Sequence, residues 1–260
     1  MPEFCKAERD GHLFTVTINR PDVMNSLHPM ANAELATLFD EFAADPELWI
    51  AIITGAGDKA FSAGNDLKFT ATTTPEQRPA QPKSGFGGLT ARFDLTKPVI
   101  AAVNGVAMGG GFEIALACDI LLASDQAVFA LPEPLVGLAA LAGGVHRLPR
   151  MIHIKQAMGM MLTGRRVGAQ EGKTMGFVTE VVPHAKLMEE ARRWAGLILA
   201  CSPMSIRATK DAAMKGLNHA SIEQAMNGDY AGVKAMRASE DLIEGPRAFA
   251  EKRKPNWKGR

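Results

Sequence analysis

The sequence predicts an α/β fold in which short buried strands alternate with helices and a run of helices follows. Short apolar or alternating runs closed by turn residues fill the first half of the chain, and such runs are typical of strands. After about residue 145 the apolar residues recur at helical spacing. The 260 residues are enough for one large domain, or for a domain with a smaller helical appendage.

The first expected elements follow in chain order. Residues 12–19 alternate with period two and contain β-branched residues, so they predict a strand. Residues 30–44 carry apolar side chains at helical spacing and predict a helix. Residues 49–54 form a short apolar run closed by Gly55, as a buried strand does. Residues 70–90 are rich in Thr, Pro, Gln and Gly, and they predict either a mobile lid or a plain solvated loop.

Three further strands are expected before the chain becomes helical. Residues 98–103 form a second buried strand that ends at the turn Asn104-Gly105. Residues 120–123 and 127–130 predict short strands on either side of a Ser-Asp turn. Helices are then expected along the apolar stripe Leu187, Ala191, Trp194 and Ile198, from Pro203 onward, and over 221–237.

Composition excludes several classes of function. Lys and Arg total 29 against 28 Asp and Glu, so no global field points to nucleic acid or to a membrane surface. No apolar stretch reaches the roughly 18 residues of a membrane span, and the N-terminus lacks the apolar region of a signal peptide. The three cysteines are far apart, which argues against a disulfide framework, and no Cys/His cluster has metal-site spacing. We therefore expect a cytoplasmic protein without a metal.

The first segment with chemical character is the glycine-rich stretch 55–67. Its opening matches Gly-x-Gly-x-x-Ala, the start of a dinucleotide-binding fingerprint. That fingerprint needs a helix at the loop and a later acidic residue at a strand end, whereas residues 61–65 break a helix and Glu76 lies in a Thr/Pro loop. We therefore favour a turn whose backbone N–H groups face a ligand over a nicotinamide site.

A second glycine-rich segment covers residues 104–119. The glycines at 109–111 allow a close backbone approach, and a helix can begin in the apolar run that starts at Phe112. A helix N-terminus presents unpaired N–H groups and a positive dipole end, which suit a developing oxyanion. The alternative is close packing of a helix against a strand.

Two isolated carboxylates lie in apolar surroundings. Glu113 is the lone charge in its run, and a fully buried Glu is rare without a partner or a role. Glu133 stands between Pro132 and Pro134, which fix its backbone. The pair predicts general acid–base chemistry on a water held between them, although a single Glu on a helix is usually just exposed.

Short motifs occur in a fixed order along nearly the whole chain. They are Ile18-Asn19-Arg20-Pro21, Met24-Asn25-Ser26-Leu27, Phe61-Ser62-Ala63-Gly64-Asn65-Asp66-Leu67, the 97–105 segment Lys-Pro-Val-Ile-Ala-Ala-Val-Asn-Gly, Gly109-Gly110-Gly111-Phe112-Glu113, Leu162-Thr163-Gly164-Arg165-Arg166 and Glu251-Lys252-Arg253-Lys254. Through this set the chain resembles the crotonase (enoyl-CoA hydratase/isomerase) superfamily, and within it the enoyl-CoA hydratases.

The resemblance implies a fold and an assembly. The fold is a crotonase-like ββα spiral core over residues 1–195, followed by a helical C-terminal trimerisation region over 196–260. The family pattern also implies a homotrimer or homohexamer.

The resemblance further implies roles for individual residues. Asn65 and Gly110 would donate the two oxyanion-hole N–H groups to the thioester carbonyl. Glu113 would activate water and Glu133 would protonate the α-carbon, or the two would share these tasks. Lys252, in the basic C-terminal stretch, would reach a CoA phosphate of its own subunit or of a neighbouring subunit. The alternative is that this stretch is a solvated tail. The residues that would line the CoA groove are Asp22, Val23, Met24, Ala63, Asp66, Leu67 and Lys68.

One residue departs from the family pattern. Leu141 takes the place of a glycine that lies near the catalytic water in hydratases. With Ala139, Ala140 and Ala142 it would form an apolar wall of the substrate pocket. The alternative is that Leu141 belongs to the core.

The implied activity is that of an enoyl-CoA hydratase, a hydro-lyase of fatty acid metabolism. It adds water reversibly, in syn fashion, across the 2,3 double bond of a 2-enoyl-CoA, and it needs no cofactor because coenzyme A is part of the substrate. Two enzymatic alternatives are an enoyl-CoA delta isomerase, which can work with one carboxylate, and a specialised acyl-CoA hydratase, for example one for crotonobetainyl-CoA. A non-catalytic scaffold or RNA-binding member is disfavoured because both glutamates are present and the net charge is near zero.

Overall fold

Two sheets form the centre of the molecule. The computed structural model describes residues 3–74, 77–78 and 80–260. The larger sheet comprises, in spatial order, β1 (Cys5–Asp10), β2 (Leu13–Ile18), β3 (Ile50–Gly55), β5 (Val99–Val103), β7 (Ile120–Ser124) and β10 (Glu180–Val182). The smaller comprises β4 (Ala60–Ser62), β6 (Val106–Met108), β8 (Val128–Ala130) and β9 (Val167–Gly168).

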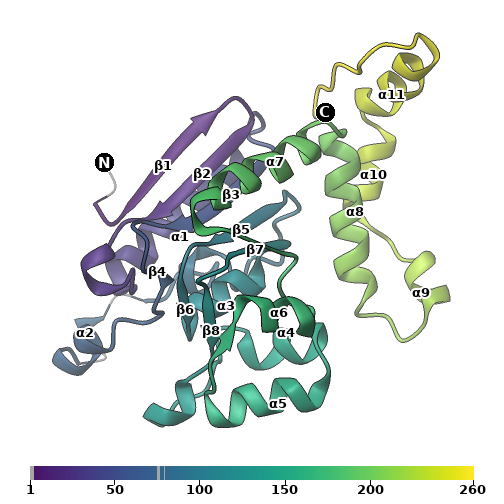
Figure 1. The fold of residues 1–260 in the computed structure, drawn as a ribbon. Coiled ribbons are helices and arrows are strands. Elements are labelled where there is room, and N and C mark those ends of the chain that lie inside the picture. Colours follow the sequence, from purple (N-terminus) through teal and green to yellow (C-terminus); the bar gives the residue numbers. More distant parts are fainter. Residues whose placement is uncertain (1–2, 75–76, 79) are drawn as a thin grey trace.

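Helices surround these sheets and then extend beyond them (Figure 1). The α-helices are α1 (Pro29–Ala44), α2 (Leu67–Thr72), α3 (Gly110–Ala117), α4 (Gly144–Met151), α5 (Ile154–Thr163), α6 (Ala169–Met175), α7 (Leu187–Leu199), α8 (Pro203–Gly216), α9 (Ile222–Met226), α10 (Ala231–Arg237) and α11 (Glu240–Ala250). Short 3-10 turns are η1 (Pro21–Val23), η3 (Phe86–Gly88), η4 (Glu133–Val136) and η5 (His184–Lys186).

The chain winds through both sheets in successive ββα turns. The pairs β3–β4, β5–β6 and β7–β8 each place one strand in the larger sheet and the next strand in the smaller one, and α2, α3 and η4–α4 follow them. Neighbouring strands from successive turns are parallel in both sheets. The expected ββα spiral is confirmed, although no internal repeat is visible in the sequence itself.

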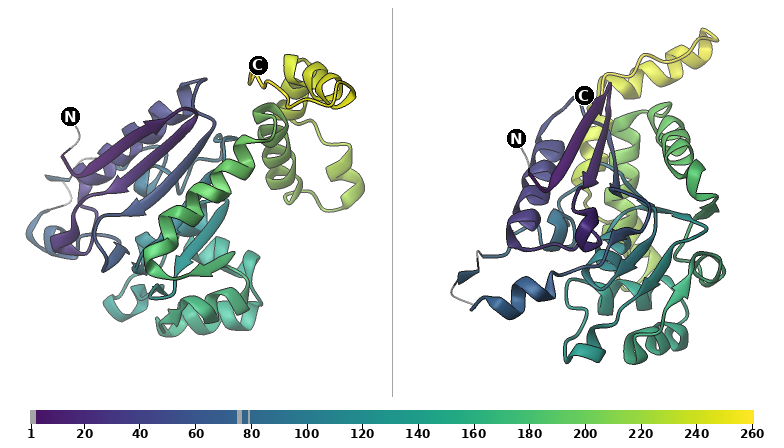
Figure 2. Two further views of the ribbon diagram at one scale, coloured as in Figure 1. Left: turned by 45° about the horizontal axis from the view of Figure 1, so that its top comes forward. Right: turned by 60° about the vertical axis from the view of Figure 1, so that its left-hand side comes forward.

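Alternation along the central strands explains how the larger sheet buries both faces. Ile50 and Ile52 of β3 pack with α7 residues such as Leu187 and Ala191, while Ala51 and Ile53 face the opposite core. That larger core also contains apolar residues of α1 and α3 and of the smaller sheet. In the right-hand view of Figure 2 the strands separate α1 from α7.

The last helices stand to one side of the core. In Figure 1, α8 and α10 lie side by side at the right and α11 projects above them. The tail after α11 folds back: Asp241 accepts hydrogen bonds from the Lys258 N–H at 2.7 Å and from the Ser202 hydroxyl at 2.8 Å. No helix of the described residues combines the length and apolar character that crossing a membrane requires.

Several sequence expectations need correction. Residues 70–90 are not one loop, since α2 runs to Thr72 and Phe86 is buried against the core. The expected helix over 221–237 is two helices, with a break at Gly228 between α9 and α10. The second half also contains β9 and β10, strands of two and three residues that are too short to show a pattern.

Candidate active site

Two glycine-rich loops meet because they follow neighbouring strands of the smaller sheet. β4 and β6 pair in parallel, so the chain leaves both strands at the same edge. Gly64 follows β4 and has a φ of 84°. A Cβ at this position would lie 2.6 Å from the Met108 carbonyl oxygen and 2.9 Å from the Gly110 nitrogen. The absence of a side chain at Gly64 therefore lets the first loop touch the start of α3.

Two backbone N–H groups remain available at this junction. Leu27 forms a parallel bridge with Asn65, in which the Leu27 N–H donates to the Gly64 carbonyl and the Asp66 N–H donates to the Leu27 carbonyl. The Asn65 N–H itself donates no backbone hydrogen bond to any described residue. Gly110 opens α3, and the first N–H groups of a helix have no intrahelical partner. Both predicted oxyanion donors thus lie at one site.

Glu113 lies one turn inside α3 and is only 3% exposed. Its Oε1 accepts a hydrogen bond of 2.8 Å from the Gly144 N–H, at the start of α4. Burial is the main cause that raises the pKa of Glu113 to about 7, and the charge of Glu133 adds to it, while hydrogen bonds from the Gly144 and Ala142 N–H groups oppose the rise. The carboxyl group can therefore exchange a proton near neutral pH.

Glu133 begins η4 and is half-buried. A Cβ added to Gly109 would lie 3.0 Å from its Oε1, so this carboxyl group faces the backbone at the start of α3. The Gly109 carbonyl accepts the Glu113 N–H, so the two residues lie four positions, roughly 6 Å along the helix axis, apart. Burial raises the pKa of Glu133, and its Oε2 is buried without a hydrogen-bond partner among the described residues. An unsatisfied buried oxygen of this kind is suited to a substrate or a water.

Two buried asparagines hold the loop between β3 and β4. The Asn25 amide donates to the carbonyls of Ala56 and Ala60, at 3.0 and 2.7 Å. The Asn104 amide donates to Gly57 and again to Ala60, at 2.8 and 3.1 Å. Asn25 adopts a left-handed φ of 54° to do so. This loop is therefore fixed from both sides before it reaches Gly64.

The predicted CoA-binding residues of η1, the first glycine loop and α2 lie around this loop, whereas Lys252 does not. The Ala63 N–H donates to the Met24 carbonyl at 2.9 Å, which joins η1 to the first glycine loop, and Asp22 and Val23 are exposed beside it. Leu67 and Lys68 are exposed on the first turn of α2.

Asp66 has a structural task at the start of α2. It accepts the Phe69 N–H at 3.1 Å and pairs with Arg20 at 3.2 Å. Burial acts to raise the pKa of Asp66, but these two partners outweigh it and hold the pKa below its usual value. Its carboxylate therefore faces Arg20 and the helix rather than a free groove.

A groove of about 410 Å³ lies beside η1. The sequence predicted Asp22 and Met24 as ligand-lining residues and a ligand-facing turn within 55–67, and the β3–β4 loop of that stretch forms the opposite wall. The lining residues are Pro21, Asp22, Met24, Asn25, Ala56, Gly57, Asp58, Lys59 and Ala60.

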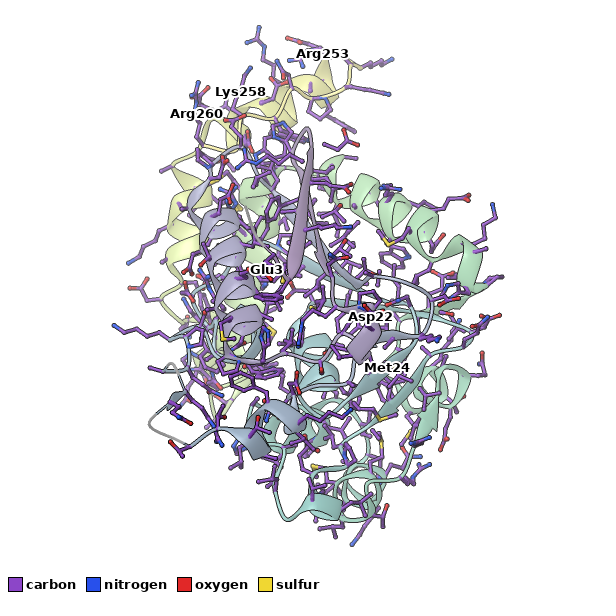
Figure 3. All side chains as sticks on the ribbon, turned by 90° about the vertical axis from the view of Figure 1, so that its left-hand side faces the viewer. Glu3, Asp22, Met24, Arg253, Lys258 and Arg260 are labelled. Atoms are coloured by element: carbon purple, nitrogen blue, oxygen red, sulfur yellow. The ribbon has the colours of Figure 1, made fainter. Side chains whose placement is uncertain are left out.

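Lys252 is the exception. It follows α11 and is exposed, with a φ of 55°. Figure 3 shows its neighbour Arg253, with Lys258 and Arg260, at the top of the molecule, away from Asp22 and Met24. Within one chain Lys252 therefore does not join the other predicted residues.

The loop that follows Glu133 is mostly on the surface. Leu141 is 74% exposed, so the alternative that it belongs to the core is wrong. Ala139 is exposed too, whereas Ala140 is buried beside Gly144 and Ala142 is partly buried against the core. The four residues therefore do not form one continuous wall.

Two side chains near the site were not predicted. The Phe86 ring lies so close to Gly110 that a Cβ there would overlap it. Arg147, one turn into α4, is near enough to Glu113 to oppose the rise of its pKa. The sequence gives little signal for either, because Phe86 lies in a segment with few apolar residues and Arg147 on a helix is usually exposed. Among the described residues, no three His, Cys, Asp or Glu side chains gather as a metal site would require.

Comparison with known proteins gives a consistent result. The family model described as enoyl-CoA hydratase/isomerase matches residues 8–260. Carnitinyl-CoA dehydratase of Escherichia coli (strain K12) is 44% identical over 264 residues, which cover all of both chains. An enoyl-CoA hydratase structure from Mycobacterium tuberculosis H37Rv superposes with a TM-score of 0.90 at 33% identity, again over all of both chains. A probable enoyl-CoA hydratase/isomerase from Mycobacterium abscessus gives a TM-score of 0.91 at 35% identity over the same coverage.

Proposed function

The chain belongs to the enoyl-CoA hydratase/isomerase family, and from this premise we propose that it is a hydro-lyase that adds water reversibly across the 2,3 double bond of a 2-enoyl-CoA. The observation that carries the proposal is that two carboxyl groups whose pKa is raised by burial lie near the start of α3. Glu113 lies within the helix, and Glu133 lies beside Gly109, the residue that precedes it. An isomerase can work with one carboxylate, whereas hydration needs both a base for water and a proton for carbon.

The thioester carbonyl is polarised by the two backbone N–H groups. The Asn65 N–H and the Gly110 N–H, which face the junction of the two glycine loops, both donate to the carbonyl oxygen. Negative charge develops there as an enolate-like transition state forms, and the positive end of the α3 dipole stabilises it. CoA lies along η1 and the start of α2, where Asp22, Val23, Met24, Ala63, Leu67 and Lys68 contact it. Asp66 stays paired with Arg20 and caps α2.

The two glutamates divide the proton transfers. Ionised Glu113 removes a proton from water as the water oxygen attacks the β-carbon. Neutral Glu133 delivers a proton to the α-carbon. Burial raises the pKa of both groups and their charges repel, so the pair readily holds one shared proton. Either carboxyl group can carry that proton, and the reverse reaction exchanges the roles. The proposed mechanism uses these residues, water and the CoA substrate.

A second candidate is dehydration of carnitinyl-CoA to an enoyl-CoA with a quaternary ammonium group. The full-length identity of 44% to the carnitinyl-CoA dehydratase supports it. A panel of enoyl-CoAs that includes crotonyl-CoA and crotonobetainyl-CoA, assayed in both directions, separates the two candidates. Turnover of simple chains supports general hydration, and turnover restricted to the betaine supports the specialised reaction. An enzyme that turns over none of the panel would refute the proposal.

Leu141 is predicted to affect the choice of acyl chain. We expect Leu141→Ala and Leu141→Gly to change kcat/KM for some chain lengths relative to others by roughly 10-fold, because an apolar contact discriminates by about 1–3 kcal/mol per methylene. The alanine variant is the cleaner one, since glycine also loosens the backbone. Leu138→Ala, also exposed in this loop, serves as the matched control. If both Leu141 variants keep the wild-type ranking across the panel, Leu141 does not face the substrate.

We predict that the protein is a homotrimer or a homohexamer. Residues 196–260 form the oligomerisation region, and several large apolar side chains there are exposed in the single chain. A stable monomer in light scattering at micromolar concentration would contradict this prediction and also a role for Lys252 across a subunit boundary. The exposed residues are Leu197, Met214, Leu217, Ile222, Met226, Leu242, Ile243 and Phe249.

A further inference from the structure

Arg147 is a partly buried cation beside the candidate active site. It lies on α4, one turn after Gly144. Its Nη2 donates to the Thr90 carbonyl at 2.9 Å, and its guanidinium carbon lies 5.8 Å from the centre of the Phe93 ring. No carboxylate forms an ion pair with it among the described residues. Its position is therefore held by the 85–95 segment rather than by a salt bridge.

The guanidinium group of Arg147 contacts the backbone next to the N–H group that binds the Glu113 carboxyl group. A Cβ at Gly143 would overlap Nη1 of Arg147, so this nitrogen touches the Gly143 backbone. The next residue, Gly144, donates its N–H to Glu113 Oε1. The Gly143–Gly144 peptide unit therefore lies between the Arg147 guanidinium group and the Glu113 carboxyl group. Gly143 has a φ of 116°, and a side chain here would meet both backbone strain and Arg147.

The charges around Glu113 come from two elements. Glu133 of η4 disfavours the ionised form, while Arg147 of α4 and the N–H groups of Ala142 and Gly144 favour it. Arg147 is itself desolvated, which lowers the pKa of its guanidinium group. Its charge nevertheless acts through a low-dielectric region, where screening by water is weak.

We propose that Arg147 is a positioning residue: it fixes the Gly143–Gly144 peptide against Glu113 and, by its charge, keeps Glu113 available as the base. This inference rests on the proposed hydratase function. It also assigns a task to the 85–95 segment, whose Thr90 and Phe93 hold the guanidinium group in place.

Arg147→Gln tests the charge, and Arg147→Lys tests the shape of the guanidinium group. Without the cation the ionised form of Glu113 loses support, so the acid limb of the kcat/KM profile should move to higher pH by about 0.5 to 1 unit, with about 3- to 10-fold lower activity at pH 6. Lysine keeps the charge, so its acid limb should stay near that of the wild type while kcat falls. Arg150→Gln, an exposed arginine on the same helix, is the control.

A direct titration separates this inference from the hydratase proposal. Carbon-13 NMR of labelled glutamate carboxyl groups, with Glu113→Gln for assignment, should show a higher midpoint for Glu113 in Arg147→Gln than in the wild type, even if no substrate is turned over. Should Arg147→Gln fail to fold, Arg147→Met, which keeps the aliphatic stem, replaces it. An unchanged Glu113 midpoint in a folded variant would refute the inference, whatever happens to thermal stability.

Discussion

Glu113→Gln is expected to lower kcat for enoyl-CoA hydration by about 10²-fold or more, the lower end of what a positioned acid–base group contributes. Glutamine keeps an oxygen that can accept the Gly144 N–H, so the binding of a substrate analogue should change much less. Glu133→Gln should have an effect of similar size, since the proposed reaction needs both groups. Steady-state kinetics with crotonyl-CoA measures both variants, and wild-type turnover by either would contradict the assignment.

The same substitution should alter how stability depends on pH. In the folded protein the pKa of Glu113 is raised from 4.5 to about 7, so the folded state retains a proton that the unfolded state releases. Stability from this group is full below pH 4.5 and is lost as pH rises through about 7. Glu113→Gln lacks this loss, so it should be more stable than the wild type at pH 8, by about 3 kcal/mol.

Thermal unfolding at pH 5 and pH 8 measures this difference. The gap in Tm between variant and wild type should be larger at pH 8 than at pH 5. Glu189→Gln is a suitable control because Glu189 is exposed on α7 and forms a surface ion pair with Lys186. A variant that is less stable than the wild type at pH 8 would show that Glu113 supports the fold in its ionised form.

Gly64→Ala is expected to lower kcat by about 10²- to 10³-fold, the loss that follows removal of one oxyanion donor. The added Cβ would lie 2.6 Å from the Met108 carbonyl oxygen and 2.9 Å from the Gly110 nitrogen, both backbone atoms that cannot rotate away. The two loops must then separate, and the Asn65 and Gly110 N–H groups no longer converge on one oxygen. Kinetics and thermal unfolding should be measured together.

Gly11→Ala is a control that separates the effect of the Cβ clash at Gly64 from the effect of backbone strain alone. Gly11 also has a positive φ, of 56°, but a Cβ there would meet no atom of the described residues within 4 Å. It lies in the turn between β1 and β2, apart from the site. We expect Gly11→Ala to lose about 1–2 kcal/mol of stability and no specific activity. Full activity in folded Gly64→Ala would mean that the two donors do not act together.

The central elements were predictable because their residues are buried in regular patterns. Residues 49–54 and 98–103 are continuous apolar runs, and both are central strands of the larger sheet. β9 and β10 were not predictable, since strands of two and three residues show no periodicity and exist only through pairing with β8 and β7. The break between α9 and α10 was missed because the apolar spacing outweighed Gly228 in the prediction.

Within the candidate site, residues that are unusual in their sequence context were easier to predict than residues whose role depends on their neighbours in the folded chain. Glu113 stood out as a lone carboxylate in an apolar run, and the glycines stood out by number. Arg147 did not, because its importance depends on Gly143 and Thr90, which lie beside it only in the folded chain. Lys252 lies away from the other predicted residues within one chain, and its predicted role therefore requires the proposed oligomer.

The surface segment that follows Glu133 has a consequence for how enzymes on this scaffold diversify. Its backbone N–H groups bond almost entirely within the segment: Leu135 to Pro132, Gly137 to Pro134, and Leu138 to Glu133. The side chains between them face solvent, while the proposed oxyanion donors, Asn65 and Gly110, follow β4 and β6. Residues 134–139, which are exposed, can therefore be exchanged by mutation or by grafting from a relative while the buried Ala140 and the two glycine loops stay in place. Such a separation lets new substrate ranges evolve at little risk to the chemistry.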